Sequence, residues 1–171
     1  VVIDFGQNIA GYVKFGFYAQ AGQCITLYHG ECLDQNGNFT QENFQAPEHR
    51  VEQCVKYICK EGWNEYKPEK SIFGFRYIKA ITDVKVTEKN FTAIAVYSDM
   101  PQTGKFECGH PGINQLFSNA VWSMKGNFLE IPTDCPTRER TGFTGDAQVF
   151  VNTGMYLMEC YPVYRKFLSE L

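Results

Sequence analysis

The segment from Asp134 to Asp146 holds the residue types best suited to catalysis. It carries three carboxylates, Asp134, Glu139 and Asp146, interleaved with the arginines Arg138 and Arg140. Glycoside hydrolysis needs a protonated carboxyl group that donates to the leaving oxygen, and a second carboxylate on the opposite face of the sugar. Carboxylates also bind sugar hydroxyls. These types and spacings are therefore compatible with acid–base chemistry on a carbohydrate.

The same residues also fit a purely structural interpretation. An Arg-Glu-Arg triplet on a loop is typical of a solvated ion-pair cluster. Asp134 could close a turn with the following Cys-Pro, and Asp146 could occupy the first turn of a helix, where the dipole favours a carboxylate. Spacing alone leaves both interpretations open.

Two regions of the chain, which differ in the spacing of their apolar residues, must position this loop. Residues 1–97 alternate apolar and polar side chains, as in 13–18 and 25–29, between turns that contain Gly and Asn. Such period-two segments predict an antiparallel β-sandwich, here an accessory domain. Residues 98–109 are expected to form a linker.

Residues 110–171 follow a helical pattern instead. Pro111 suits the first turn of a helix that should end near Gly126-Asn127, because apolar residues recur at helical spacing between them. A second helix is expected to start near Asp146, and a third after Pro162. So few helices cannot cover their own apolar faces. We therefore expect an incomplete helical domain, with self-association possible through its exposed faces.

The composition of the chain limits the classes of partner that we expect. The formal net charge is -3, from 16 Lys and Arg against 19 Asp and Glu, which argues against a nucleic-acid partner because phosphate binding needs a basic face. No apolar run is long enough to span a bilayer, so no membrane partner is expected. The chain opens at Val1 rather than Met, so we expect the natural N-terminus upstream and leave the compartment open between cytoplasm, periplasm and secretion.

Cysteine and histidine spacing predicts neither a metal nor a cofactor. The seven cysteines include no CxxC pair, which argues against a zinc ribbon or a thioredoxin-like site. Buried free thiols are expected, and a Cys54–Cys59 disulfide is the alternative for an exported protein. His29 and His110 lack a second ligand at metal spacing and are expected to be structural, whereas His49 should be exposed.

Two further patterns have competing interpretations. Residues 34–38 resemble a calcium loop in composition, but Asn36-Gly37 is typical of a hairpin turn, which we prefer. Trp63, Tyr66 and Phe73 could form a platform for carbohydrate, although packing in the core is the expected outcome. Asp4 and Asn8 are expected to be structural.

The acidic loop resembles the signature loop of the bacterial α-L-rhamnosidases, glycoside hydrolase family 78. The similar stretches are 134–136, 138–140, Gly142 and 144–148 within the loop, with 127–133, 104–108, 113–116, 4–13 and 74–78 elsewhere. The resemblance covers nearly the whole chain. It implies a multidomain β + α fragment, in which an antiparallel β-sandwich precedes the first helices of an (α/α)6 barrel.

The resemblance also implies roles for individual residues. Glu139 matches the family's general acid, and Asp134 and Asp146 match carboxylates that bind rhamnose hydroxyls. Arg138 would orient these acids. Phe143 stands where the family usually has Trp, so an aromatic face remains but the indole N–H is lost.

The family is an inverting one and needs a separate general base to activate water. In the family that base is a Glu much later in the barrel, and nothing in this sequence matches it. The expected function is therefore part of an enzyme that releases terminal α-L-rhamnose from rhamnosides, with little or no turnover by this chain alone. The alternatives are a non-catalytic carbohydrate-binding β-sandwich with a helical appendage, and a related barrel enzyme for another sugar.

Overall fold

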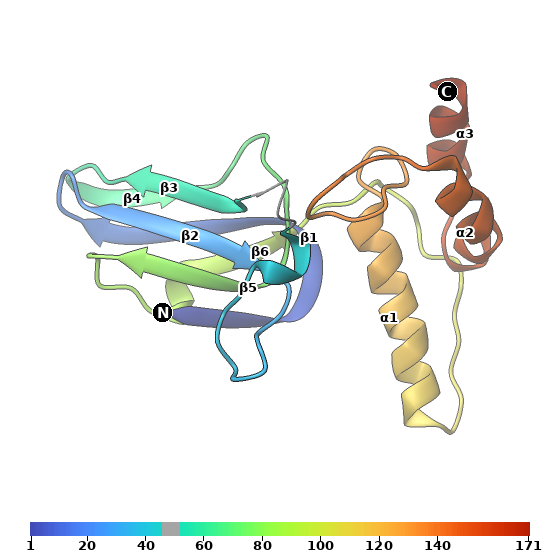
Figure 1. Ribbon diagram of the computed structural model, residues 1–171, viewed down its shortest axis with the longest axis horizontal. Coiled ribbons are helices and arrows are strands. Elements are labelled where there is room, and N and C mark those ends of the chain that lie inside the picture. Colours follow the sequence, from blue (N-terminus) through green and yellow to red (C-terminus); the bar gives the residue numbers. More distant parts are fainter. Residues whose placement is uncertain (46–51) are drawn as a thin grey trace. The chain divides into compact units, whose positions relative to one another are not determined.

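The computed structural model describes residues 1–45 and 52–171, which form two compact units, Val1–Ala95 and Val96–Leu171 (Figure 1). The expectation for His49 lies outside the described residues. In the described part of the chain, no helix combines the length and the apolar character needed to cross a membrane.

The first unit is one curled antiparallel sheet with the strand order β3-β2-β5-β1-β4, and with β6 paired to β1. The strands described are β1 (Val2–Ala19), β2 (Cys24–Gly30), β3 (Cys54–Ile58), β4 (Gly62–Tyr66), β5 (Phe73–Thr82) and β6 (Phe91–Ala95), with short 3-10 helices at Glu42–Phe44 and Glu88–Asn90. The predicted antiparallel β-rich region is confirmed, in the form of this curled sheet.

The long strand β1 makes the sheet curl because it changes partners along its length. It pairs first with β5, up to Gly11, and then with β4, from Phe15 onward, while its other edge pairs with β6. A Cβ at Gly11 would lie 1.9 Å from the carbonyl oxygen of Ile94, so only glycine allows this close strand approach. The two ends of the sheet then face each other, since the ring centroids of Tyr57 on β3 and Tyr66 on β4 lie 5.3 Å apart.

The expected packing of three aromatic residues is partly wrong. Phe73 is buried, and Tyr66 is half-buried against Phe15. Trp63, however, is 48% exposed and meets the exposed ring of Tyr18 edge-on at 5.1 Å. Trp63 lies on β4, a strand that the sequence pattern did not predict.

His29 has the structural role that was expected. Its ring is fully buried and stacks on Phe73 at 4.2 Å, and its Nδ1 lies 3.3 Å from the carbonyl oxygen of Gln53. Burial lowers the pKa of His29 to about 4, although the Gln53 carbonyl opposes this shift. The imidazole is therefore neutral at physiological pH.

All seven cysteines are free thiols, as expected, but only Cys59 and Cys160 are buried. The alternative Cys54–Cys59 disulfide does not form. β3 begins at Cys54 and Cys59 directly follows its end, so about five extended residues, roughly 16 Å of strand, separate the two thiols. A disulfide requires Cα atoms within about 7 Å.

Two aspartates in the sheet unit have structural roles. Asp34 Oδ1 accepts hydrogen bonds from the backbone N–H groups of Asn36 and Asn38, and Gly37 has φ +80°. This confirms the hairpin-turn interpretation. Asp4 accepts two hydrogen bonds of 2.8 Å from Arg76, which lower its pKa, and its expected structural role is also confirmed.

The second unit contains α1 (Pro111–Asn127), α2 (Thr144–Leu157) and α3 (Tyr161–Ser169). α1 spans the predicted residues, whereas α2 begins at Thr144 rather than Asp146, and α3 includes Pro162 in its first turn. Gln102 forms an isolated antiparallel bridge with Met158, and the N–H groups of Thr103 and Gly104 donate to the carbonyl of Leu157.

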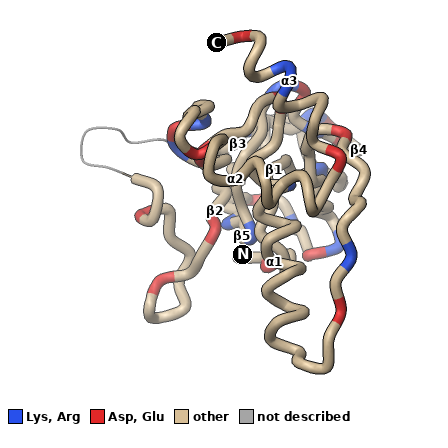
Figure 2. Tube along the Cα trace, turned by 90° about the vertical axis from the view of Figure 1, so that its right-hand side faces the viewer, with Lys and Arg blue, Asp and Glu red and all other residues tan. Residues whose placement is uncertain are grey.

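α1 and α2 are nearly free of charge, and most of their trace is tan in Figure 2, the colour of residues other than Lys, Arg, Asp and Glu. Lys125 is the charged residue of α1 and Asp146 that of α2. Their packed faces meet α3 in one core, whose buried members are Met100, Val121, Met124, Phe128, Ala147, Leu157, Met158, Cys160, Val163, Tyr164 and Phe167. Leu116, Val149 and Tyr156 remain exposed. Self-association through such faces stays a prediction.

Candidate active site

The acidic loop between α1 and α2 is closed by a reciprocal pair of hydrogen bonds. Asp134 Oδ1 accepts from the backbone N–H of Thr141 at 2.9 Å, and the Asp134 N–H donates to the Thr141 carbonyl at 3.1 Å. The closed loop holds Arg140 at φ +56°, a left-handed conformation that is uncommon outside glycine. Gly142 then lies against Phe167 and Ile131, where a Cβ would fall within 3 Å of both side chains.

The environment of Asp134 favours the ionised carboxylate. Burial raises its pKa, but the hydrogen bonds that it accepts from the Cys135 thiol and from backbone N–H groups, including that of Thr141, outweigh this effect. The pKa of Asp134 therefore lies below its ordinary value. At neutral pH this side chain is an acceptor for hydroxyl groups and not a proton donor.

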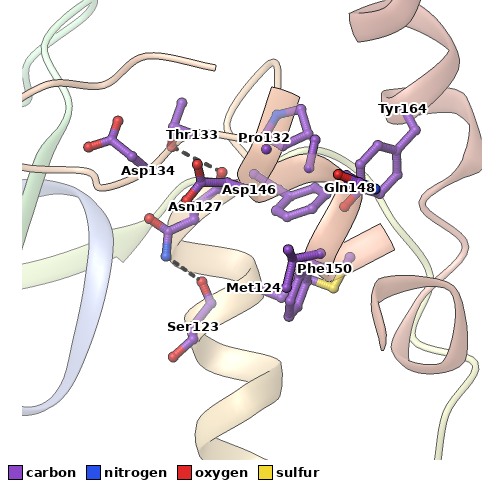
Figure 3. Close-up of a pocket in the computed structure, with 14 residues that line it drawn as sticks. Ser123, Met124, Asn127, Pro132, Thr133, Asp134, Asp146, Gln148, Phe150 and Tyr164 are labelled. Carbon is purple, nitrogen blue, oxygen red and sulfur yellow. Dashed lines mark hydrogen bonds between the residues drawn. The ribbon is translucent and has the colours of Figure 1, made fainter. Parts of the chain in front are cut away.

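A cavity of about 680 Å³ lies beside this loop. Its walls come from the end of α1, the following loop, the start of α2 and one residue of α3 (Figure 3). The lining residues are Ser123, Met124, Asn127, Phe128, Pro132, Thr133, Asp134, Gly145, Asp146, Ala147, Gln148, Val149, Phe150 and Tyr164.

The cavity brings together the two aspartates that the sequence singled out for sugar binding. Asp134 and Asp146 both line it, although the loop separates them in the chain. Apolar side chains, among them Met124, Phe128 and Phe150, form much of the remaining wall. A pocket with apolar walls and a few fixed polar groups is typical of small-molecule sites, and it suits a sugar, which has hydroxyls and apolar C–H faces.

The other three candidates do not line this cavity. Glu139 and Arg138 form an ion pair with a distance of 2.5 Å between Nη2 and Oε1, and their side chains are 41% and 44% exposed. Phe143 directly precedes α2 and is 42% exposed. The structure thus places Glu139 on the same short loop as Asp134, but outside the walls around the two aspartates.

Sequence reasoning missed several lining residues. Asn127 and Thr133 lie in a stretch that had been noted only for its resemblance, as the approach to the loop. Gln148 follows Asp146 closely, which was a usable signal. Tyr164 had no local signal, because only the packing of α3 against α1 and α2 brings it to the cavity. Within the described residues, no group of three or more His, Cys, Asp or Glu side chains could hold a metal ion.

Two family models match almost the whole chain. The bacterial alpha-L-rhamnosidase concanavalin-like domain matches residues 1–97, and the bacterial alpha-L-rhamnosidase 6 hairpin glycosidase domain matches residues 101–171. The chain belongs to the bacterial α-L-rhamnosidase family. The resemblance inferred from the sequence motifs is thereby confirmed.

Individual α-L-rhamnosidases agree with this assignment over nearly the full chain. One from Formosa agariphila is 34% identical over 174 residues, which is 99% of this chain and 18% of the relative. A crystal structure of the Streptomyces avermitilis α-L-rhamnosidase complexed with L-rhamnose matches with a TM-score of 0.93 and 35% identity, over 99% of this chain and 16% of that one. The crystal structure of the native Aspergillus terreus enzyme matches with a TM-score of 0.91 and 36% identity, and the match covers 98% of this chain and 20% of that one. The chain thus spans about a fifth of the length of these relatives.

Proposed function

We propose that this chain forms the general-acid part of an inverting α-L-rhamnosidase active site, which releases terminal α-L-rhamnose from rhamnosides as part of a longer protein. Asp134 and Asp146 bind hydroxyls of the rhamnose ring, and Glu139 protonates the glycosidic oxygen. The observation that carries this proposal is that two aspartates from opposite ends of the acidic loop line one cavity, in a chain whose relatives are α-L-rhamnosidases.

The environment of each acid supports this division of roles. Because the pKa of Asp134 is held low, its carboxylate accepts hydrogen bonds from hydroxyls but is a poor proton donor. Asp146 lies in the first turn of α2, where the helix dipole favours a carboxylate. Glu139 is the remaining acid of the loop, and its partial exposure leaves it accessible to a leaving group outside the cavity.

Arg138 and Phe143 have supporting roles in this proposal. The Arg138 guanidinium contacts the Glu139 carboxylate and orients it. Phe143 presents an exposed aromatic face next to the loop, against which the apolar side of a sugar can pack.

An inverting mechanism also requires a general base that activates water on the far side of the sugar. We place that base in the part of the barrel that lies outside these 171 residues, because no residue of this chain matches it. The helices α1–α3 would then be the start of an (α/α)6 barrel, with the curled sheet as its accessory domain.

A non-catalytic role in carbohydrate binding is the second candidate. The observation that favours it is the exposed aromatic pair of Tyr18 and Trp63 on the sheet, because aromatic faces are typical platforms for sugars. In that case Trp63→Ala would abolish sugar binding, whereas substitutions in the acidic loop would leave it unchanged.

Binding and turnover by the purified chain test the proposal. We expect L-rhamnose to bind, and a chromogenic aryl α-L-rhamnoside to be hydrolysed very slowly or not at all. Asp134→Asn and Asp146→Asn should weaken binding, while Trp63→Ala should not. Absence of L-rhamnose binding at millimolar concentrations would overturn the proposed sugar site. Rapid turnover would overturn the placement of the general base outside this chain.

A further inference from the structure

The thiol of Cys135 makes hydrogen bonds to two residues of the acidic loop. Its Sγ accepts a hydrogen bond from the backbone N–H of Arg138, with 3.4 Å between nitrogen and sulfur. The thiol also donates a hydrogen bond to the side chain of Asp134, the residue before it. One sulfur atom therefore connects a carboxylate at the cavity with the residue whose guanidinium contacts Glu139.

Cys135 directly precedes a turn, residues 136–139, whose first half is buried. Pro136 and Thr137 are buried, and the proline fixes the backbone at the start of the turn. The side chain of Arg138, by contrast, is 44% exposed. The bond from the Arg138 N–H to the Cys135 sulfur therefore ties the exposed half of the turn back to the residue at which the turn begins.

The Asp134 carboxylate is held by donors from two parts of the loop. Its Oδ1 accepts from the backbone N–H of Thr141 at 2.9 Å, and the Cys135 thiol is the second side-chain or backbone group that fixes it. Burial raises the pKa of Asp134, and the bond from the thiol is the largest of the effects that lower it. Donors to a carboxylate stabilise its charged form and restrict its rotation. The thiol thus favours both the ionised state and one orientation of Asp134.

We propose that Cys135 is a positioning residue of the sugar site, whose thiol orients Asp134 toward the hydroxyls of rhamnose and holds the backbone of Arg138 beside it. Cys135 does not itself line the cavity. It therefore acts on the sugar through Asp134, and on the proposed general acid through the Arg138–Glu139 ion pair. This inference rests on the proposed function of the cavity.

Two substitutions of Cys135 separate its hydrogen bonds from its bulk. Cys135→Ala removes the sulfur and both hydrogen bonds, whereas Cys135→Ser keeps one donor and one acceptor at the same place. Cys108→Ala is the matched control. Cys108 is another half-buried cysteine of the helical unit, its thiol donates to the His110 carbonyl, and it does not line the cavity.

L-rhamnose binding, measured by NMR titration of the whole chain, is the first readout. We expect the Kd of Cys135→Ala to rise about three- to tenfold, as for the loss of one hydrogen bond that orients a binding group. Cys135→Ser and the Cys108→Ala control should stay within about twofold of the unchanged chain. An equal loss in Cys135→Ala and Cys135→Ser would mean that the sulfur acts by its bulk, and would overturn the positioning role.

The pKa of Asp134 in the sugar-free protein is a second readout, which a merely structural role of Cys135 would not move. A 13C carboxyl titration measures it, with the signal assigned by its absence from Asp134→Asn. We expect this pKa to rise in Cys135→Ala, because the effect of burial is then less opposed, and to stay low in Cys135→Ser. An unchanged pKa in Cys135→Ala would overturn the role of the thiol.

Amide hydrogen exchange of Arg138 tests the other end of the link. We expect its N–H to exchange faster in Cys135→Ala than in the unchanged chain, because its acceptor is lost. Equal exchange would overturn the connection to Arg138. If the unchanged chain binds L-rhamnose and Cys135→Ala binds it equally well, the inference is wrong and the proposed function stands. If the unchanged chain does not bind L-rhamnose, both fail.

Discussion

The sheet unit and the helical unit differ in how the buried carboxamide atoms of their side chains are hydrogen-bonded. In the sheet, Asn64 is fully buried and uses its whole carboxamide: Oδ1 accepts from the Tyr57 hydroxyl and the Lys60 N–H, and Nδ2 donates to the carbonyls of Lys60 and Gly62. In the helical unit, Asn127 leaves Oδ1 without a partner among the described residues, at the wall of a cavity.

Gln53 repeats the pattern of the sheet. It is buried and exchanges two hydrogen bonds with the main chain of Gly74, one as donor and one as acceptor. Buried amides in this unit thus connect loops and strand edges. The comparison indicates that the sheet unit uses both ends of such groups for its own stability, whereas Asn127 in the helical unit uses only its Nδ2 among the described residues.

The largest expected effect is on the sheet. Asn64→Ala removes four hydrogen bonds and leaves the N–H and carbonyl of Lys60 without these partners. We expect the free energy of unfolding to fall by about 4 kcal/mol, measured by urea denaturation. Asn43→Ala is the control, because Asn43 is exposed and its Nδ2 donates to the half-buried Glu31 carboxylate, and it should change stability by less than about 0.5 kcal/mol.

The pH dependence of the free energy of unfolding should show that His29 is neutral in the folded protein. Its pKa of about 4 in the folded protein lies below the ordinary value of 6.5, so the unfolded chain binds the proton more readily. The contribution of His29 to the free energy of unfolding is therefore complete above pH 6.5 and is lost as the pH falls toward 4. The total loss is about 3 kcal/mol. Urea titrations between pH 4 and 7 measure it.

His29→Phe provides the control for that titration. It keeps an aromatic ring against Phe73 but cannot titrate, so its stability should vary less with pH over this range. An equal pH dependence in both proteins would show that His29 is not the group responsible.

In the helical unit the expected effects are on binding. Asp134→Asn keeps the shape of the side chain but removes the charge, and we expect the Kd for L-rhamnose to rise at least tenfold, because hydrogen bonds to charged groups are the stronger ones. The substitution should be compared with Asp99→Asn, an exposed aspartate of the same unit that does not line the cavity. Equal losses for the two variants would remove Asp134 from the proposed site.

The smallest expected effect separates catalysis from binding. Glu139→Gln should change the Kd for L-rhamnose by less than about twofold, because Glu139 lies outside the cavity walls and is assigned to proton transfer rather than to binding. A loss of binding comparable to that of Asp134→Asn would instead favour a binding role for Glu139.

The parts of the fold that depend on local pattern could be predicted from the sequence. α1 has a proline at its start and apolar residues at regular spacing, and its limits were found closely. β4 and β6 were missed because each is defined by its pairing with β1, far away in the sequence. The exposure of Trp63 could not be read from its type, because it depends on which face of β4 points outward.

The residues of the candidate site likewise fall into those that the sequence pattern signals and those that it does not. Asp134 and Asp146 were found because they share one recognisable loop, and the structure places both at one cavity. Tyr164 comes from a different helix and reaches the cavity only through the packing of three helices. That its buried hydroxyl has no hydrogen-bond partner among the described residues follows from the same packing, and no pattern in the sequence signals it.

The most direct test of the central claim is an NMR titration of the 15N-labelled chain with L-rhamnose, with the amide signals assigned. We expect saturable shifts concentrated in residues 127–134 and 144–150, which contribute most of the cavity lining, and little change in the sheet. Saturable shifts centred on Trp63 and Tyr18 instead, or none in either unit, would contradict the assignment of the sugar site to the acidic loop.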